Sequence, residues 1–442
     1  MKKLFFLSII LAVITSCSNN SSGELTGVLG RKDYFEPDPF GMVFVPAGSF
    51  NMGPADEDVS WAQNTMTRTV TVDAFWMDET EVTNNEYRQF VYWVRDSIMR
   101  RLLSEQLEDY AISEDAYGNA IDPPVLNWDT KIDFNDEETN TILEEMYLPQ
   151  NERFFGRKEI DTRKLIYEYY WVDLKQAAKK SNRYNYQTKK YDGYVTNLDG
   201  DQIEITDRSA FVHRDVVPVY PDTLCWIADF TYSYNEPLST MYFWHPAYDN
   251  YPVVGVNWKQ ANAFSVWRTQ FLNNALRGNG ESFVHDYRLP IEAEWEYAAR
   301  GGLDLSMYPW GGLYTRNSTG CFLANFKPLR GNYSDDGGVA TVAVGTYEPN
   351  EWGLYDMAGN VAEWTANAYD ESDYVFSHDL NPDYKYNAKP DDPPVMKRKV
   401  IRGGSWKDIA YFIQTGTRSY EYQDTAKAYI GFRCVRSYLG NQ

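Results

Sequence analysis

Cysteine and histidine, which bind zinc and most transition metals, are scarce in this chain of 442 residues, which has only four of each. No two cysteines have the Cys-x2-Cys spacing of a structural zinc site. The histidines stand far apart in the sequence, at His213, His245, His285 and His378. The sequence therefore indicates neither a zinc module nor the closely spaced histidine motif of a metalloenzyme.

Basic residues and long apolar runs are also few. The 42 lysines and arginines are outnumbered by 63 aspartates and glutamates, so the formal net charge is −21. This imbalance excludes a general basic surface for nucleic acid. The only long apolar run lies at the N-terminus, so no later segment is predicted to span a membrane.

Common catalytic signatures are missing as well. The chain has no Gly-x-Ser-x-Gly elbow, no His-Glu-x-x-His motif and no P-loop. A glycosidase-like pair of carboxylates stays open, because acidic residues are numerous. In so acidic a protein, however, most of them are expected on the solvated surface.

The N-terminus has the features of an export signal. Lys2 and Lys3 precede an apolar segment at 4–14, which is too short to span a bilayer. Residues 1–16 are therefore predicted to be a signal peptide.

Cys17 directly follows this signal. The sequence Ile-Thr-Ser-Cys at this point resembles a bacterial lipobox. The resemblance implies cleavage before Cys17 and lipidation of that residue; the alternative is an ordinary signal peptide beside a stray cysteine. Residues 17–39 would then be a tether, which begins polar and uncharged. In similar lipoproteins of Bacteroidetes, an acidic cluster directly after the cysteine commonly marks export to the cell surface. The first acid in this chain is Glu24, so the resemblance implies the periplasmic face of the outer membrane.

Hydrophobic patterns predict one α+β domain at 40–442, interrupted by an insertion at 97–247. The insertion is rich in tyrosine and charged residues, and its apolar periodicity is weaker. Thr83 and Glu86 have the spacing of a capping box at the start of a helix. The other predicted elements are strands at 42–53, 68–72 and 252–258, helices near 97–112, 157–180 and 290–300, and a hairpin at 194–205.

Aromatic side chains gather towards the end of the insertion. Two interpretations are open: they pack the insertion onto the main domain, or they form a contact with a partner. The cluster consists of Trp226, Phe230, Tyr232, Tyr242, Phe243 and Trp244, beside Pro221.

Eight short motifs resemble the formylglycine-generating enzyme, or sulfatase-modifying factor, family and occur in that family's order. The resemblance implies a fold similar to the C-type-lectin-like fold, low in regular secondary structure, on both sides of the large insertion at 97–247. The motifs are 50–53, 81–84, 252–258, 288–302, 309–311, 359–364, 402–406 and 430–434.

The enzymes of this family oxidise a cysteine with two copper-binding cysteines, three and eight residues after the serine of the Arg-Gly-Gly-Ser motif. In this chain that serine is Ser405, and the two positions hold Asp408 and Ile413. Neither side chain supplies the thiolate that such copper chemistry needs. We therefore expect no copper and a non-catalytic protein.

The family also binds structural calcium through oxygen donors in irregular loops, which suit this ion. The resemblance implies a first ligand set of Asp356, Gly359, Val361 and Glu363. It implies a second set of Asn325, Phe326, Asp336 and Gly338. The alternative for Asp356 and Glu363 is turn-capping without a metal.

Cys434 occupies a position where the family usually has a disulfide cysteine. The usual partner position holds Ala299 in this chain. A replacement disulfide between Cys321 and Cys434 is our hypothesis.

A second, narrower resemblance is carried by the lipoprotein signal and by residues 23–27, 78–91, 95–98 and 220–226. These segments are similar to the gliding-motility lipoproteins of the type IX secretion system of Bacteroidetes, the GldK/PorK family. The resemblance implies an outer-membrane lipoprotein that self-associates into a periplasmic ring with a GldN/PorN-like protein. Two other hypotheses stay open: a carbohydrate- or peptidoglycan-binding lipoprotein, and an enzyme with unrecognised oxidase chemistry.

Overall fold

The structure is a computed structural model that describes residues 36–54, 66–197, 200–229, 236–328 and 338–440, together with Leu25, Gly27, Val28 and Tyr34. The chain divides into a compact unit Asp38–Leu439 and a terminal unit of Met1–Pro37 with Gly440–Gln442. The predicted signal peptide and Cys17 lie outside the described residues. None of the helices in the described ranges combines the length and apolar character needed to cross a bilayer.

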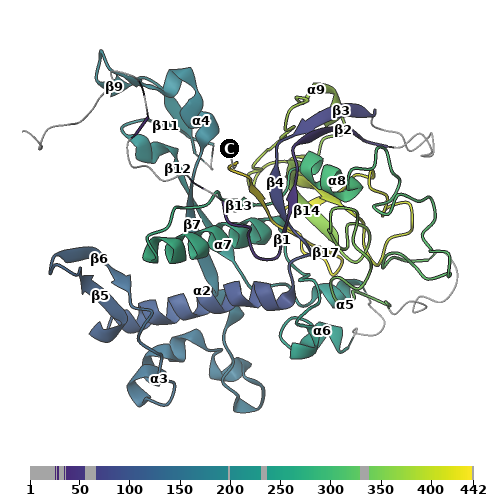
Figure 1. Ribbon diagram of the computed structural model, residues 1–442. Helices are drawn as coiled ribbons and strands as arrows, with labels where there is room; N and C mark the ends of the chain where they lie inside the picture. Colours follow the sequence, from purple (N-terminus) through teal and green to yellow (C-terminus); the bar gives the residue numbers. More distant parts are fainter. Residues whose placement is uncertain are drawn as a thin grey trace, which may run out of the picture. The chain divides into compact units, whose positions relative to one another are not determined.

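Two four-stranded sheets and one hairpin form the main domain within Asp38–Leu439 (Figure 1). The first sheet is antiparallel, in the order β1 (Met42–Val45), β4 (Phe75–Asp78), β18 (Val435–Ser437) and β13 (Tyr287–Arg288). The second has the order β16 (Ser419–Tyr422), β15 (Arg398–Arg402), β14 (Ala362–Ala368) and β17 (Ile430–Gly431), with β17 parallel to β14. The hairpin pairs β2 (Gly48–Met52) with β3 (Arg68–Val72). The predicted strands at 42–53 and 68–72 are thus confirmed.

Two helices of 21 residues, α2 (Asn84–Ser104) and α7 (Trp258–Gly278), pack against each other (Figure 1). The predicted capping box of α2 is present, because the Thr83 backbone N–H donates to Glu86 Oε2 at 2.7 Å. Ring stacking of Tyr87 on Phe264, with centroids 5.6 Å apart, joins the two helices in the core.

The third helix of the main domain, α8 (Glu292–Arg300), is buried along its whole length. It ends at Gly301, whose φ of 57° is the left-handed conformation that favours glycine at a helix end. The helix predicted at 290–300 is therefore confirmed. Shorter helical elements of the main domain are α9 (Asp373–Phe376) and the 3₁₀ turns Pro246–Tyr248 and Pro394–Lys397.

The insertion consists of strand pairs and short helices. Its strand pairs are β5 (Ala111–Glu114) with β6 (Ala120–Leu126), β7 (Ile166–Val172) with β12 (Val212–Pro218), β8 (Tyr184–Asn185) with β9 (Lys190–Tyr191), and β10 (Tyr194–Thr196) with β11 (Gln202–Glu204). Its helices are α3 (Glu137–Leu143), α4 (Leu174–Ala178), α5 (Cys225–Asp229) and α6 (Leu238–Met241). Its 3₁₀ turns are Glu108–Tyr110, Glu144–Met146, Gln150–Glu152, Phe154–Gly156, Thr162–Lys164, Lys180–Asn182 and Arg208–Phe211. Side chains such as Leu143, Tyr167 and Val217 belong to the same buried cluster as the main domain, so the two share a core.

The helix predicted near 157–180 is wrong. The longest regular element of this segment is strand β7, in which the buried Tyr167 and Tyr169 alternate with exposed residues, and α4 covers only five residues. A period of two places these tyrosines on one face of a strand, as on a half-buried sheet. The helix predicted near 97–112 ends at Ser104 as part of α2.

The strand predicted at 252–258 is also absent. The backbone N–H of Val253 donates to Val82, and that of Gly255 donates to Lys427, so the segment bonds to two different neighbours. Helix α7 then starts at Trp258. The hairpin predicted at 194–205 is confirmed by the β10–β11 pairing.

Three of the four described aromatic members of the cluster at the end of the insertion pack inward. Trp226, Tyr242 and Phe243 are buried, whereas half of Trp244 is exposed. Phe230 and Tyr232 lie outside the described residues. The packing interpretation therefore holds for the buried members.

Candidate functional site

Buried ion pairs connect two of the sequence motifs. Helix α8 carries Glu292, Glu296 and Arg300 at four-residue spacing, and all three are at most 2% exposed. Glu296 accepts from Arg300 Nη2 at 2.6 Å and also pairs with Arg402 Nη2, at the end of β15. Glu292 pairs with Arg418 Nε at 2.6 Å. Buried charges need such compensation, so these motif residues stabilise the scaffold.

The turn after β15 holds the two positions where the family resemblance places copper-binding cysteines. Ser405 Oγ donates to Asp408 Oδ2 at 2.6 Å, and burial raises the pKa of Asp408. Ile413 is fully buried and packs with Tyr308 and Phe326 in a small apolar cluster. Asp408 thus stabilises a turn and Ile413 fills part of an apolar cluster. Neither side chain has a sulfur atom.

Three cysteines lie in the described part of the chain, and of these Cys321 and Cys434 are free thiols. Cys434 Sγ lies 3.4 Å from Ser265 Oγ, and burial raises the pKa of this thiol to about 12. Cys321 is exposed in a turn where its backbone N–H donates to Asn317 Oδ1. The expected disulfide between Cys321 and Cys434 is therefore not formed in the structure, because one thiol is in the core and the other is on the surface.

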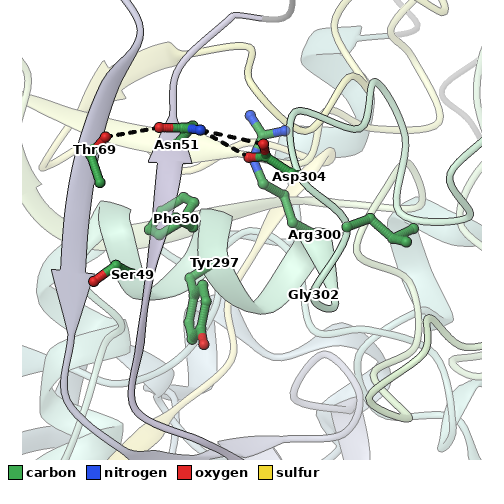
Figure 2. Close-up of a pocket in the computed structure, with 9 residues that line it drawn as sticks. Ser49, Phe50, Asn51, Thr69, Tyr297, Arg300, Gly302 and Asp304 are labelled. Atoms are coloured by element: carbon green, nitrogen blue, oxygen red, sulfur yellow. Dashed lines mark hydrogen bonds between the residues drawn. The ribbon is translucent and has the colours of Figure 1, made fainter.

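A polar hollow of about 440 Å³ lies where β2 and β3 meet the end of α8 (Figure 2). Asn51 Nδ2 donates to Asp304 Oδ1 at 3.2 Å, and Thr69 Oγ1 donates to Asn51 Oδ1 at 2.9 Å. Its nine lining residues include no cysteine or histidine. This hollow can offer hydrogen bonds to a ligand, but it has no nucleophile paired with a base. The lining is Ser49, Phe50, Asn51, Thr69, Tyr297, Arg300, Gly302, Leu303 and Asp304.

Three buried carboxylates, those of Glu81, Asp356 and Glu363, lie around the guanidinium of Arg433. Glu363 accepts from Arg433 Nη2 and from Trp295 Nε1, both at 2.7 Å. Burial raises the pKa of Glu81 well above its ordinary value, and the charges of Asp356 and Glu363 raise it further. Burial likewise raises the pKa of Asp356 to about 6. The cluster therefore has more negative than positive groups.

The first predicted calcium set lies in this cluster, on a tightly curved loop. Asp356, Gly359 and Asn360 all have positive φ, at 55°, 81° and 56°. The predicted donors of the first set are all oxygens, which is the donor type that calcium takes, but both Glu363 oxygens already accept from Arg433. Within the described ranges, no point is surrounded by three or more His, Cys, Asp or Glu side chains that could hold a metal ion. Calcium binding at this loop stays a prediction.

The second predicted set adjoins the first. The backbone oxygen of Asn325 accepts from the backbone N–H of Asn360 at 2.8 Å. The side-chain amide of Asn325 also donates to Asn360 Oδ1 at 3.2 Å. Phe326 packs in the same cluster as Ile413, and Gly338 lies so close to Asn325 that a side chain there would clash. Asp336 lies outside the described residues.

Sequence reasoning missed Glu81 and Arg433 as members of this site. Both lie within motifs that carried the family resemblance, at 81–84 and 430–434. A buried charged residue in a short motif is a signal of pairing, but the partner could not be inferred because it lies far away in the sequence.

The motif residues thus form the internal framework of a domain that mixes helices and sheets. The chain belongs to the sulfatase-modifying factor enzyme 1-like domain family, whose sequence profile matches residues 32–146 and 168–438. The family predicted from the motifs is confirmed.

Relatives in this family include both enzymes and inactive proteins. The chain is 33% identical to inactive C-alpha-formylglycine-generating enzyme 2 of Bos taurus over 191 residues, covering 42% of this chain and 50% of that protein. It is 32% identical to the formylglycine-generating enzyme of Thermomonospora curvata over 192 residues, covering 42% of this chain and 55% of that enzyme. The chain therefore spans about half the length of these curated relatives. Membership of the family does not decide whether this chain is catalytic.

Among solved structures, PvdO from Pseudomonas aeruginosa aligns with 90% of this chain and 94% of its own length. The sequence identity is 18% and the TM-score is 0.43.

Proposed function

We propose that this protein is a non-catalytic, lipid-anchored subunit of the periplasmic ring of a type IX secretion system. It would sit at the outer membrane through Cys17, assemble with copies of itself and a GldN/PorN-like protein, and support protein secretion and gliding. In this proposal a C-type-lectin-like scaffold of the sulfatase-modifying factor family serves as a building block. The non-catalytic part rests on one observation: Asp408 and Ile413 occupy the two positions where the enzymes need thiols.

Exposed apolar side chains on the insertion support a role in assembly. Phe154 and Phe155 are 75% and 96% exposed, and Phe155 has a positive φ of 51°. A bulky residue in the left-handed region costs stability, and such strain is concentrated at functional positions. Large exposed aromatic side chains are also characteristic of protein contacts. We therefore place one partner contact at the Phe154–Gly156 turn.

The test is to extract the native, full-length protein in detergent and to image it by electron microscopy. We expect large rings that contain one additional soluble protein, and no oxidation of a cysteine peptide in the presence of copper and oxygen. A monomer without a companion protein would overturn the ring proposal, and turnover of the peptide would overturn its non-catalytic part.

A double variant and a matched control test whether Phe154 and Phe155 form this partner contact. We expect Phe154→Ser with Phe155→Ser to reduce the yield of rings at least about tenfold, because interface aromatics carry much of the binding free energy. Val375→Ser, which changes an 82% exposed residue of the main domain, is the control and should leave the yield unchanged. Equal ring yields from both variants would rule out a contact at Phe154 and Phe155.

We also propose that the loop at Asp356 binds structural calcium, with the second set at Asn325 as its neighbour. A cation would offset the excess negative charge of the three carboxylates around Arg433. An ion that binds only the folded state stabilises it, by about 4 kcal/mol when its free concentration is about 1,000 times its Kd.

A chelator should therefore lower the melting temperature of the protein by several degrees, and added calcium should restore it. Asp356→Asn should abolish the response, whereas Asp391→Asn, at an exposed position, should retain it. An unchanged melting temperature on chelation would refute calcium binding.

A further inference from the structure

A groove of about 480 Å³ lies between the insertion and the main domain. One wall is the β7–β12 pair, the other is the start of α7, and residues 385–390 form part of the rim. The aromatic side chains of Tyr169, Trp171 and Trp258 line it. The volume falls within the range of ligand-binding pockets. The groove shares no lining residue with the polar hollow or with the loop at Asp356.

The groove is basic, although the whole protein has a net charge of −21. Its lining contains Lys259, Arg288, Lys385 and Lys389 but only one acid, Asp215. Arg288 is neutralised by Glu294 at 2.6 Å, and Lys385 is paired with Asp383 at 2.9 Å.

Two of these lysines are free to bind an anion. In the part of the chain that the structure describes, no carboxylate oxygen lies within 4.0 Å of the Nζ atom of Lys259 or Lys389, although Asp392 Oδ2 accepts from the backbone N–H of Lys389 at 2.7 Å. Lys259 is exposed and Lys389 is partly exposed, so their ammonium groups remain accessible to a ligand. An ammonium group donates hydrogen bonds and accepts none.

A third amine lies next to the groove. Lys399 is fully buried, and its Nζ lies 3.9 Å from the centroid of the Trp258 ring and donates to the backbone oxygen of Tyr386 at 2.6 Å. Burial, together with the charges of Lys385 and Lys259, lowers the pKa of Lys399 to about 7. Positive charge is thus concentrated around Trp258 without enough carboxylates to balance it.

The hydrogen-bonding groups of the groove favour a carboxylate ligand over a sugar. Asp215 Oδ2 already accepts from Trp171 Nε1 at 2.8 Å, and the Gln423 side chain donates to the backbone oxygen of Ala388 at 2.9 Å. The two lysine ammonium groups, by contrast, offer donors only. A carboxylate needs donors only, whereas every sugar hydroxyl also needs an acceptor for its proton.

We propose that this groove binds a short acidic peptide segment of a partner protein. Carboxylates of the segment contact Lys259 and Lys389, and an apolar side chain between them packs against Trp171 and Trp258. The aromatic walls bury this side chain, and the lysines select against neutral or basic segments. The assignment does not depend on the ring proposal, because it rests only on the groove.

Calorimetry on the full-length protein tests this with a pentapeptide that has four glutamates around a central phenylalanine. We expect saturable binding that weakens between about 50 and 200 mM salt, because ionic contacts are screened. The same peptide with glutamines in place of the glutamates should bind at least about tenfold more weakly.

Variants of the protein provide the matched controls. Lys259→Gln with Lys389→Gln should weaken binding of the acidic peptide at least about tenfold, with an unchanged melting temperature. Lys175→Gln removes the same kind of charge from an exposed position in α4 and should leave the affinity unchanged.

Three outcomes overturn the assignment: no saturable binding, equal binding of the glutamine peptide, or equal binding by the Lys259–Lys389 double variant. A fourth is tighter binding of a trimer of galacturonic acid than of the acidic peptide, which would assign the groove to an acidic sugar.

Discussion

Glu296→Gln is expected to destabilise the folded protein by about 3–5 kcal/mol, the usual cost of breaking a buried ion pair. The Glu296 carboxylate is fully buried and serves three donors: the guanidinium groups of Arg300 and Arg402, and the backbone N–H of Gly53 at 2.8 Å. The amide has a similar shape but no charge, and it offers one acceptor oxygen instead of two. The buried guanidinium groups of Arg300 and Arg402 would then lose the carboxylate charge that both of them pair with.

The shift in the urea midpoint, with the slope unchanged, measures this loss. Glu351→Gln is the control because Glu351 is exposed, and it should change the stability by less than about 0.5 kcal/mol. A loss below about 1 kcal/mol for Glu296→Gln would show that the buried cluster of α8 does not stabilise the scaffold as we infer.

Structural features that depend on a few neighbouring residues were predicted correctly from the sequence. Thr83 and Glu86 form the predicted capping box, and Gly301 ends α8 in the left-handed conformation. The hairpin that turns at Gly200 pairs as expected. In each case the determinants lie within one turn of chain, so the physical cause is contained in the local sequence.

Pairings between distant segments could not be predicted in this way. The carboxylate of Glu81 accepts from the side chain of Asn360, 279 residues later, and Arg433 donates to Glu363, 70 residues earlier. Such contacts depend on how the whole chain folds, and a charged residue in a motif does not identify its partner. The helix predicted near 157–180 failed for a related reason, because pairing with β12 fixes the segment of Tyr167 and Tyr169 as a strand.

Long-range packing also makes Trp226 the position in the insertion where we expect a substitution to cost the most stability. Its side chain is 1% exposed and lies in a buried cluster with Tyr242 and Trp406, at ring-centroid distances of 4.9 and 6.1 Å. Trp406 directly follows the Arg-Gly-Gly-Ser motif of the main domain, so this cluster joins the insertion to the scaffold. Trp226→Ala would leave a large cavity, and we expect a loss of about 3–5 kcal/mol in the free energy of unfolding.

Trp244→Ala is the matched control, because Trp244 belongs to the same aromatic group but is 51% exposed. Its truncation should cost less than about 1 kcal/mol, since little surface is uncovered and the cavity term is missing. The urea midpoints of the two variants therefore separate packing from partner contact. If Trp226→Ala were as stable as Trp244→Ala while ring formation failed, the cluster at Trp226 would bind a partner rather than hold the insertion on the main domain.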